Sequence, residues 1–264
     1  MSRQAGAVWD PAQYGVFGDE RARPFAELLS RVDLEAPGHI VDLGCGSGEL
    51  TASLLRRWPE ATIEAFDSSP EMIAAARGIP GRLTFSVGDV AAWRPERPVD
   101  LIVSNAVLHW VPSHQDLLPR WIEALAPGGR LAFQVPGNFD APSHTLLREI
   151  CASPRWRARL GDAVRPRPVL DPSGYLDLLA GHGCAVDAWE TTYAQLLPGD
   201  DPVLEWVKGT ALRPVLTRLD PAETTAFLAE YGARLREAYP AAPYGTVFPF
   251  RRVFVVAGGP AGGP

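Results

Sequence analysis

The sequence predicts an α/β fold, a doubly wound and mostly parallel sheet of seven strands with a helical lid insertion. An apolar run at 39–41 is followed by a glycine-rich turn and an amphipathic stretch at 49–58. That order is typical of the strand, turn and helix that open a nucleotide-binding βαβ unit. Four more apolar runs then alternate with helical stretches over roughly a hundred residues, as in parallel sheets. Two later strands, expected at 184–196 and 252–257, complete the seven.

The glycine turn at 42–48 has the spacing Asp-x-Gly-x-Gly-x-Gly. The dinucleotide fingerprint needs a third small residue where the helix packs on the strand, and Glu49 occupies that position here. Asp42, at the end of the strand, is poorly placed beside a pyrophosphate and suits a ligand with an ammonium group and no phosphates. The glycines leave no Cβ where such a ligand approaches, and the next helix begins with unpaired N–H groups facing it.

Acidic side chains also follow the next two strands. The candidate strand at 61–66 ends in Asp67, about 20 residues after the glycine turn, where such folds hydrogen-bond a ribose diol. We favour this role over that of an exposed acid in a turn, because Asp67 comes directly after a buried strand. Asp89 follows the candidate strand 83–87 and is expected beside the adenine end of a bound nucleoside. The fourth and fifth strands are expected at 100–105 and 130–135.

The chain is expected to contain four segments. They are an N-terminal arm or flap at 1–30, a cofactor-binding core at 31–136, a helical lid with the last two sheet strands at 137–257, and a disordered tail at 258–264. The aromatic arm has two interpretations. It either packs its aromatic side chains on the body or covers the cofactor site with Tyr14, Arg21 and Arg23 facing inward. Spacing alone favours packing.

Composition limits the class of protein. A chain of 264 residues that is 46% hydrophobic can bury one sizeable core. The net charge of −6 argues against a nucleic-acid substrate. The three cysteines are widely separated and lack metal-ligand spacing, so we expect no disulfide framework, no metal and a reducing cytoplasm. No apolar run suggests a signal peptide or a membrane span, so a cytoplasmic protein is expected, while the oligomeric state, monomer included, stays open.

The glycine turn, Asp67, Asp89 and the segment 125–131 together resemble the Rossmann-like class I S-adenosylmethionine (SAM) methyltransferases. The resemblance extends over nearly the whole chain to members that methylate trans-aconitate, through 9–24, 67–73, 105–110, 144–149, 212–214, 239–240 and 252–254. It implies SAM as the cofactor. The cofactor-binding residues that it implies are Arg23, Asp42, Gly44, Gly46, Gly48, Asp67, Ser68, Met72, Asp89, Val90 and Asn105.

The activity that the resemblance implies is methyl transfer from SAM to a carboxylate of trans-aconitate or a similar small polycarboxylate. The products are a monomethyl ester and S-adenosylhomocysteine. A carboxylate is ionised at neutral pH and needs no general base, so alignment, worth about 7–11 kcal/mol, is the main requirement. Arginine forks suit a polycarboxylate. The substrate-binding candidates are Arg21, Arg148, Arg213 and Arg252, and the orienting candidates are Tyr14, His109 and Trp110.

Other readings stay open at this point. The first is a SAM-dependent methyltransferase that acts on another small metabolite with His109 as the general base. The second is a nicotinamide-dependent oxidoreductase, against which Glu49 argues, and the third is a SAM-binding protein without catalysis. The stretch 155–167 is more basic than the resemblance leads us to expect.

Overall fold

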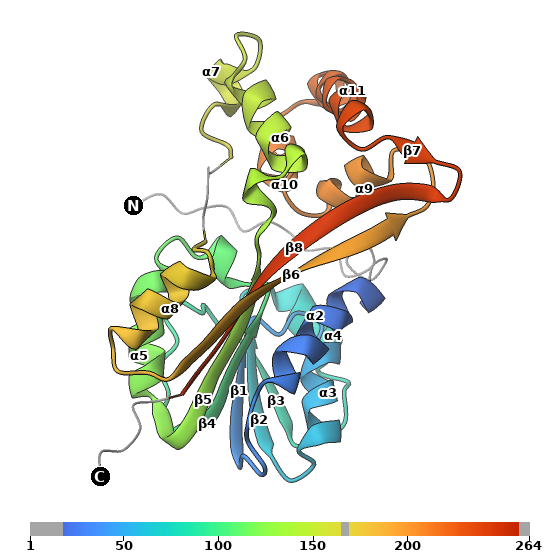
Figure 1. The fold of residues 1–264 in the computed structure, drawn as a ribbon. Coiled ribbons are helices and arrows are strands. Elements are labelled where there is room, and N and C mark those ends of the chain that lie inside the picture. The colour runs from blue at the N-terminus through green and yellow to red at the C-terminus, as the bar shows by residue number, and fades with distance from the viewer. Residues whose placement is uncertain (1–17, 165–168, 259–264) are drawn as a thin grey trace. The chain divides into compact units, whose positions relative to one another are not determined.

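The computed structural model describes residues 18–164 and 169–258 (Figure 1). The chain divides into two compact units. Unit 1 comprises Met1–Val135, Val169–Glu190 and Val253–Pro264, and unit 2 comprises Pro136–Pro168 and Thr191–Arg252. Residues 169–190, which fall within the predicted lid segment, therefore belong to unit 1 here. The four-segment division of the chain stays a prediction.

The described residues form one sheet in the order β3-β2-β1-β4-β5-β8-β6, and the two-residue strand β7 pairs with β8. The strands from β3 to β5 pair in parallel, so the predicted α/β class and the mostly parallel sheet are confirmed. The strands are β1 His39–Leu43, β2 Thr62–Asp67, β3 Leu83–Val87, β4 Val99–Asn105, β5 Leu125–Pro136, β6 Val186–Leu197, β7 Ala241–Ala242 and β8 Gly245–Gly258.

The central position of β1 follows from its sequence. All five of its residues are buried, as expected for a strand that is flanked by β2 and β4 and covered on both faces. Its register pairs Leu43 with Phe66, so Asp67 lies level with the first glycine of the turn. Asp42 of β1 and Asp67 of β2 are thus brought to the same edge of the sheet.

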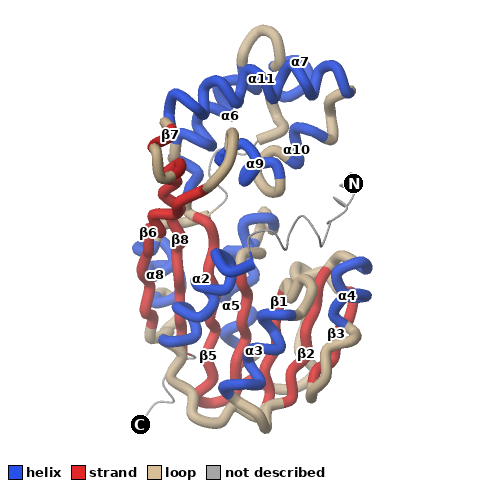
Figure 2. Tube along the Cα trace, turned by 90° about the vertical axis from the view of Figure 1, so that its right-hand side faces the viewer, coloured by secondary structure: helices blue, strands red, loops and turns tan. Residues whose placement is uncertain are grey.

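Helices cover both faces of the sheet in unit 1, with α5 and α8 on one face and α2 and α3 on the other (Figures 1 and 2). The helix α2 is held to β6, because Trp189 Nε1 donates to Glu27 Oε1 at 3.0 Å and Arg31 pairs with Asp187 at 3.0 Å. The helices of unit 1 are α2 Gly18–Ser30, α3 Glu49–Arg57, α4 Pro70–Ala76, the 3₁₀ helix η1 Leu108–Trp110, α5 His114–Glu123 and α8 Pro172–Ala180.

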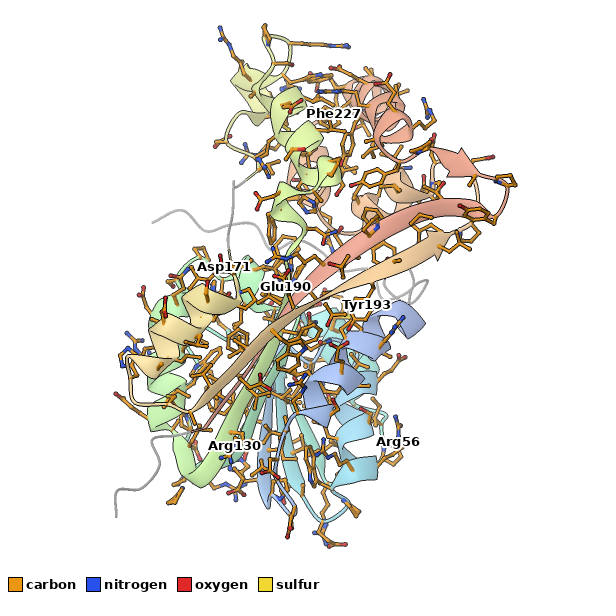
Figure 3. All side chains as sticks on the ribbon, viewed as in Figure 1. Arg56, Arg130, Asp171, Glu190, Tyr193 and Phe227 are labelled. Atoms are coloured by element: carbon orange, nitrogen blue, oxygen red, sulfur yellow. The ribbon has the colours of Figure 1, made fainter. Side chains whose placement is uncertain are left out.

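Unit 2 is built around α11, which packs against α6 and α9. Phe227 of α11 is fully buried and lies 5.3 Å from Trp156 between ring centroids (Figure 3). The backbone N–H of Ser143 in α6 donates to Tyr239 Oη at 3.0 Å, which ties the start of α6 to the residue that follows α11. The helices of unit 2 are the 3₁₀ helix η2 Asn138–Asp140, α6 Pro142–Ala152, α7 Arg157–Leu160, α9 Pro202–Lys208, α10 Arg213–Leu216 and α11 Pro221–Ala238.

The structure corrects some expected element boundaries. The last strand, expected at 252–257, begins at Gly245, because Thr246, Phe248 and Phe250 are buried in the alternating pattern of a strand. Pro249 stands on its exposed side and interrupts the pattern in the sequence. The helical stretch that begins at Pro202 ends at Lys208, before Gly209, and α10 follows separately.

None of the helices within residues 18–164 and 169–258 has the length and hydropathy of a membrane span.

Candidate functional site

The glycine turn, residues 44–48, adopts left-handed backbone at each of its three glycines. The φ angles are +90° at Gly44, +55° at Gly46 and +81° at Gly48. A Cβ at Gly44 would lie 2.1 Å from Val107 Cγ2, and one at Gly48 would lie 2.8 Å from the Phe85 ring. A Cβ at Gly46 would meet no atom of the described residues within 4 Å. Packing therefore requires the outer glycines, whereas the middle glycine borders open space.

The carboxylate of Asp67 holds this turn in place. Its Oδ2 accepts a hydrogen bond from the backbone N–H of Gly46 at 2.9 Å, and its Oδ1 accepts one from Ser69 N–H at 2.9 Å. Ser69 in turn caps α4, because its Oγ accepts from Met72 N–H at 3.2 Å. Each carboxylate oxygen has a further lone pair, so Asp67 retains the capacity to bind a ligand hydroxyl.

Asp42 carries the most perturbed carboxyl of the site. It is 3% exposed, and its Oδ2 accepts from Thr51 Oγ1 at 2.6 Å. Its Oδ1 is buried without a hydrogen-bond partner in the described part of the chain. Burial raises the pKa of Asp42 to about 7, the hydrogen bond from Thr51 opposes this rise, and the charge of Asp67 adds to it. A cationic donor beside Oδ1 would satisfy both the unpartnered atom and the buried charge.

The thiol of Cys45, inside the turn, is not a nucleophile in this setting. Burial and the charges of Asp42 and Asp67 raise the pKa of Cys45, which keeps the thiol protonated at neutral pH.

The end of β3 lies beside the end of β2, because Gly88 N–H donates to the carbonyl oxygen of Asp67 at 2.9 Å. Asp89 is exposed and accepts from Ala91 N–H at 2.9 Å, while Val90 is buried. Gly88 thus adjoins Asp67, and the two predicted residues Asp89 and Val90 follow Gly88 directly in the chain. The other two predicted residues in this region are Ser68, which is exposed, and Met72, which is buried at the start of α4.

The end of β4 lies beside the glycine turn. Asn105 Oδ1 accepts a hydrogen bond from Gln134 Nε2 at 2.5 Å, and Ala106, with φ +58°, donates its N–H to the Gln134 carbonyl at 2.9 Å. Val107 then packs against Gly44. The sequence predicted a site role for Asn105 but not for Gln134, Ala106 or Val107. Gln134 stands opposite Asn105 in the β4–β5 register, which the strand order would have revealed.

The orienting candidates are only partly described. His109 and Trp110 lie in η1 with ring centroids 4.8 Å apart, and Trp110 is 41% exposed. Tyr14 lies outside the described residues, and so does the side chain of Arg21. Arg23 is exposed on α2. The roles of these residues stay predictions.

The other three substrate-binding candidates, Arg148, Arg213 and Arg252, all belong to unit 2. Arg148 Nη1 donates to the Phe139 carbonyl at 2.6 Å. Burial lowers the pKa of Arg213, and Arg252 is 5% exposed with its guanidinium 4.5 Å from the centre of the Phe250 ring. Of the three, Arg252 is buried, and a buried arginine requires compensating partners, which separates it from the solvated arginines of the surface.

Two arginines of the basic stretch 155–167 pair with acids, and residues 165–167 of the stretch lie outside the described part of the chain. Arg155 pairs with Glu230 at 3.5 Å and Arg159 with Glu223, and both acids lie on α11. These arginines therefore pair with acids inside unit 2, and they give no reason to extend the set of substrate-binding candidates.

The sheet order and the Asp-x-Gly-x-Gly-x-Gly turn define a class of nucleoside-binding α/β proteins, and comparison with known proteins identifies which. The family described as "Methyltransferase domain" matches residues 17–188. A solved structure of the complex between the Haloferax volcanii Trm112 methyltransferase activator and a putative methyltransferase contains a chain with the same fold. Its TM-score is 0.56 at 20% sequence identity, with 95% of each chain covered. The fold is that of the methyltransferases, and the chain belongs to this family.

Closer relatives define the family more narrowly. A trans-aconitate 2-methyltransferase of Streptomyces avermitilis is 57% identical over 258 residues, which cover 94% of this chain and 96% of the relative. One of Rhodococcus jostii is 54% identical, with 95% and 99% covered. The chain belongs to the family of the trans-aconitate 2-methyltransferases. The expected membership of the class I methyltransferases is thereby confirmed.

The raised pKa of Asp42 predicts how stability depends on pH. The folded carboxyl titrates near 7 and the unfolded one near 3.8, so burying the charge costs stability as the pH rises through this interval. We expect Asp42→Asn to unfold with a free energy higher than that of the wild type at pH 8, by up to about 4 kcal/mol. The gain should shrink steadily between pH 7 and pH 4, as measured by urea unfolding. Asp89→Asn, which removes an exposed carboxylate, serves as the control. A difference that does not change with pH would contradict this account.

Proposed function

We propose that this chain transfers a methyl group from SAM to a carboxylate of trans-aconitate, giving a monomethyl ester and S-adenosylhomocysteine. The observation that carries the proposal is the buried, unpartnered Oδ1 of Asp42 beside a glycine turn whose middle glycine borders open space. The names of the relatives supply the substrate. The net charge of −6 agrees with a small-molecule substrate in place of a nucleic acid.

The residues at the edge of the sheet fit SAM. Asp42 Oδ1 would accept from its ammonium group, and Gly46 would let it approach the backbone. Asp67 would use its remaining lone pairs for the ribose hydroxyls, and Asp89 with Val90 would meet the adenine. When bound, SAM supplies a sulfonium-activated methyl group for in-line displacement by a nucleophilic oxygen. The remaining members of the proposed cofactor-binding set are Arg23, Gly44, Gly48, Ser68, Met72 and Asn105.

The chain's contribution to the chemistry is alignment. The substrate carboxylate is ionised at neutral pH, so no side chain has to remove a proton. Arg148, Arg213 and Arg252 would bind the carboxylates of the substrate through paired N–H donors, which fixes its orientation. His109 then serves as a hydrogen-bond donor or a packing group, and Tyr14 and Trp110 as orienting groups. Holding the reacting atoms in line is worth about 7–11 kcal/mol.

Product analysis tests the proposed function. The protein is incubated with SAM and, in separate reactions, trans-aconitate and other di- and tricarboxylates, and products are identified by mass and by hydrolysis in base. We expect a base-labile monomethyl ester with trans-aconitate. Binding of SAM without esterification of any polycarboxylate would refute the substrate, and a base-stable methylated product would favour another acceptor.

Arginine and histidine variants separate the proposed mechanism from one that uses a base. Arg213→Ala should raise KM for trans-aconitate at least about tenfold, because a charge-assisted carboxylate contact is worth roughly 1.5–3 kcal/mol. Its Kd for SAM should not change. Arg218→Ala removes another arginine of unit 2, one that pairs with Asp162, and is the matched control. His109→Ala should lower kcat less than Arg213→Ala does. A loss of about a thousandfold in the His109 variant alone would instead indicate a general base.

A further inference from the structure

The pair Asn105 and Gln134 lies toward the carboxyl ends of β4 and β5, which pair with each other. β4 also pairs with β1, the strand that leads into the glycine turn. Gln134 is 1% exposed, whereas Asn105 is partly exposed. The two residues stand opposite each other in the register, and Gln134 Nε2 lies 2.5 Å from Asn105 Oδ1. A short, partly buried amide–amide hydrogen bond thus lies at this edge of the sheet.

With the Gln134 amide placed so that its Nε2 faces Asn105, this hydrogen bond selects one orientation of the Asn105 amide. An amide nitrogen only donates and an amide oxygen only accepts, so Asn105 must turn its Oδ1 toward Gln134 Nε2. Its Nδ2, with two N–H donors, then points away from Gln134. Nδ2 donates to no acceptor of the residues that the structure describes. Asn105 therefore presents a donor at this edge.

The backbone next to Asn105 is also held by Gln134. The carbonyl oxygen of Gln134 accepts from Ala106 N–H at 2.9 Å, and Ala106 has φ +58°, a conformation that costs an alanine stability. The next residue, Val107, packs against Gly44 of the turn. On the other side, Ser104 Oγ donates to the Leu43 carbonyl at 2.8 Å. Asn105 is thus fixed next to the glycine turn from both directions along the chain.

We propose that Gln134 is a positioning residue, which orients the Asn105 amide so that it donates a hydrogen bond to a carboxylate at the methyl-transfer site. The inference rests on the proposed function, in which two carboxylates bind near the turn. One belongs to the amino-acid part of SAM and the other is the reacting carboxylate of the substrate. A flipped Asn105 amide would direct its oxygen at either carboxylate and repel it. Both carboxylates therefore require the orientation in which Asn105 donates from Nδ2.

Gln134→Glu, assayed at a pH high enough to ionise the new buried carboxyl, reverses the amide, because a carboxylate only accepts and Asn105 must then turn its Nδ2 toward it. Gln134→Met keeps the length of the side chain and removes the hydrogen bond, so it leaves the amide free to rotate. We expect Gln134→Glu to impair either the binding of SAM or the reaction with trans-aconitate at least tenfold. Gln134→Met should impair the same step less. If the carboxylate is that of SAM, the constant that changes is the Kd for SAM measured by calorimetry. If it is that of the substrate, KM or kcat with trans-aconitate changes while Kd is constant. Unchanged Kd, KM and kcat in Gln134→Glu would overturn the proposal.

A double-mutant cycle tests whether Gln134 acts through Asn105. Asn105→Ala should lose at least as much as Gln134→Met, and the double variant should lose no more than Asn105→Ala alone. If the losses of the two single variants instead multiply in the double variant, the proposal is overturned. A Gln134 variant with a lower melting temperature but unchanged Kd, KM and kcat would also overturn it. The reaction of the wild type separates a failure of the proposed function from a failure of the positioning role. If it yields no ester while Gln134→Glu still weakens SAM binding, the proposed function fails and the positioning role stands.

Discussion

The carboxylate of Asp67 is the interaction on which the rest of the site depends. It accepts one backbone N–H from Gly46 and another from Ser69, so a single side chain joins the glycine turn after β1 to the start of α4. The β1–β2 register makes this possible, because it sets Asp67 level with Gly44. The carbonyl oxygen of the same residue accepts from Gly88 N–H and brings in the end of β3. Asp67 thus connects three consecutive strand ends at the edge where ligands of doubly wound sheets bind.

Because Asp67 already holds the glycine turn in place, the binding of a ligand does not have to reorganise its backbone. Val107 and Phe85 fill the space against the outer glycines, and the middle glycine stays open. The remaining cost is electrostatic, since Asp42 is buried with one unpartnered oxygen and a pKa near 7. A buried anion that is unfavourable in the free protein becomes favourable once a cation pairs with it. Asp42 therefore lowers the stability of the ligand-free protein and, by the same buried charge, favours the binding of a cationic ligand.

Local sequence patterns predicted the parts of the site that are local in the chain. The strands at 83–87 and 100–105, the glycine turn and Asp67 all follow from apolar runs and from spacing within one βαβ unit. Gln134 and Val107 did not, because their roles arise from β4–β5 pairing and from contact with Gly44, which no short window of sequence contains. The start of β8 was missed because Pro249 interrupts its alternation. The pairing of Arg155 and Arg159 with acids on α11 is likewise a long-range contact that the local sequence does not contain. The assignment of Arg148, Arg213 and Arg252 to the substrate still depends on resemblance.

The central claim is that Asp67 forms the turn before any ligand binds, and hydrogen exchange of the Gly46 amide in the ligand-free protein tests it directly. The amide should be protected in the wild type and should exchange at least about tenfold faster in Asp67→Ala, since its acceptor is removed. The Ala91 amide, which donates to Asp89, should exchange at the same rate in both proteins and serves as the internal control. A Gly46 amide that exchanges equally fast with and without the Asp67 carboxylate would contradict the account.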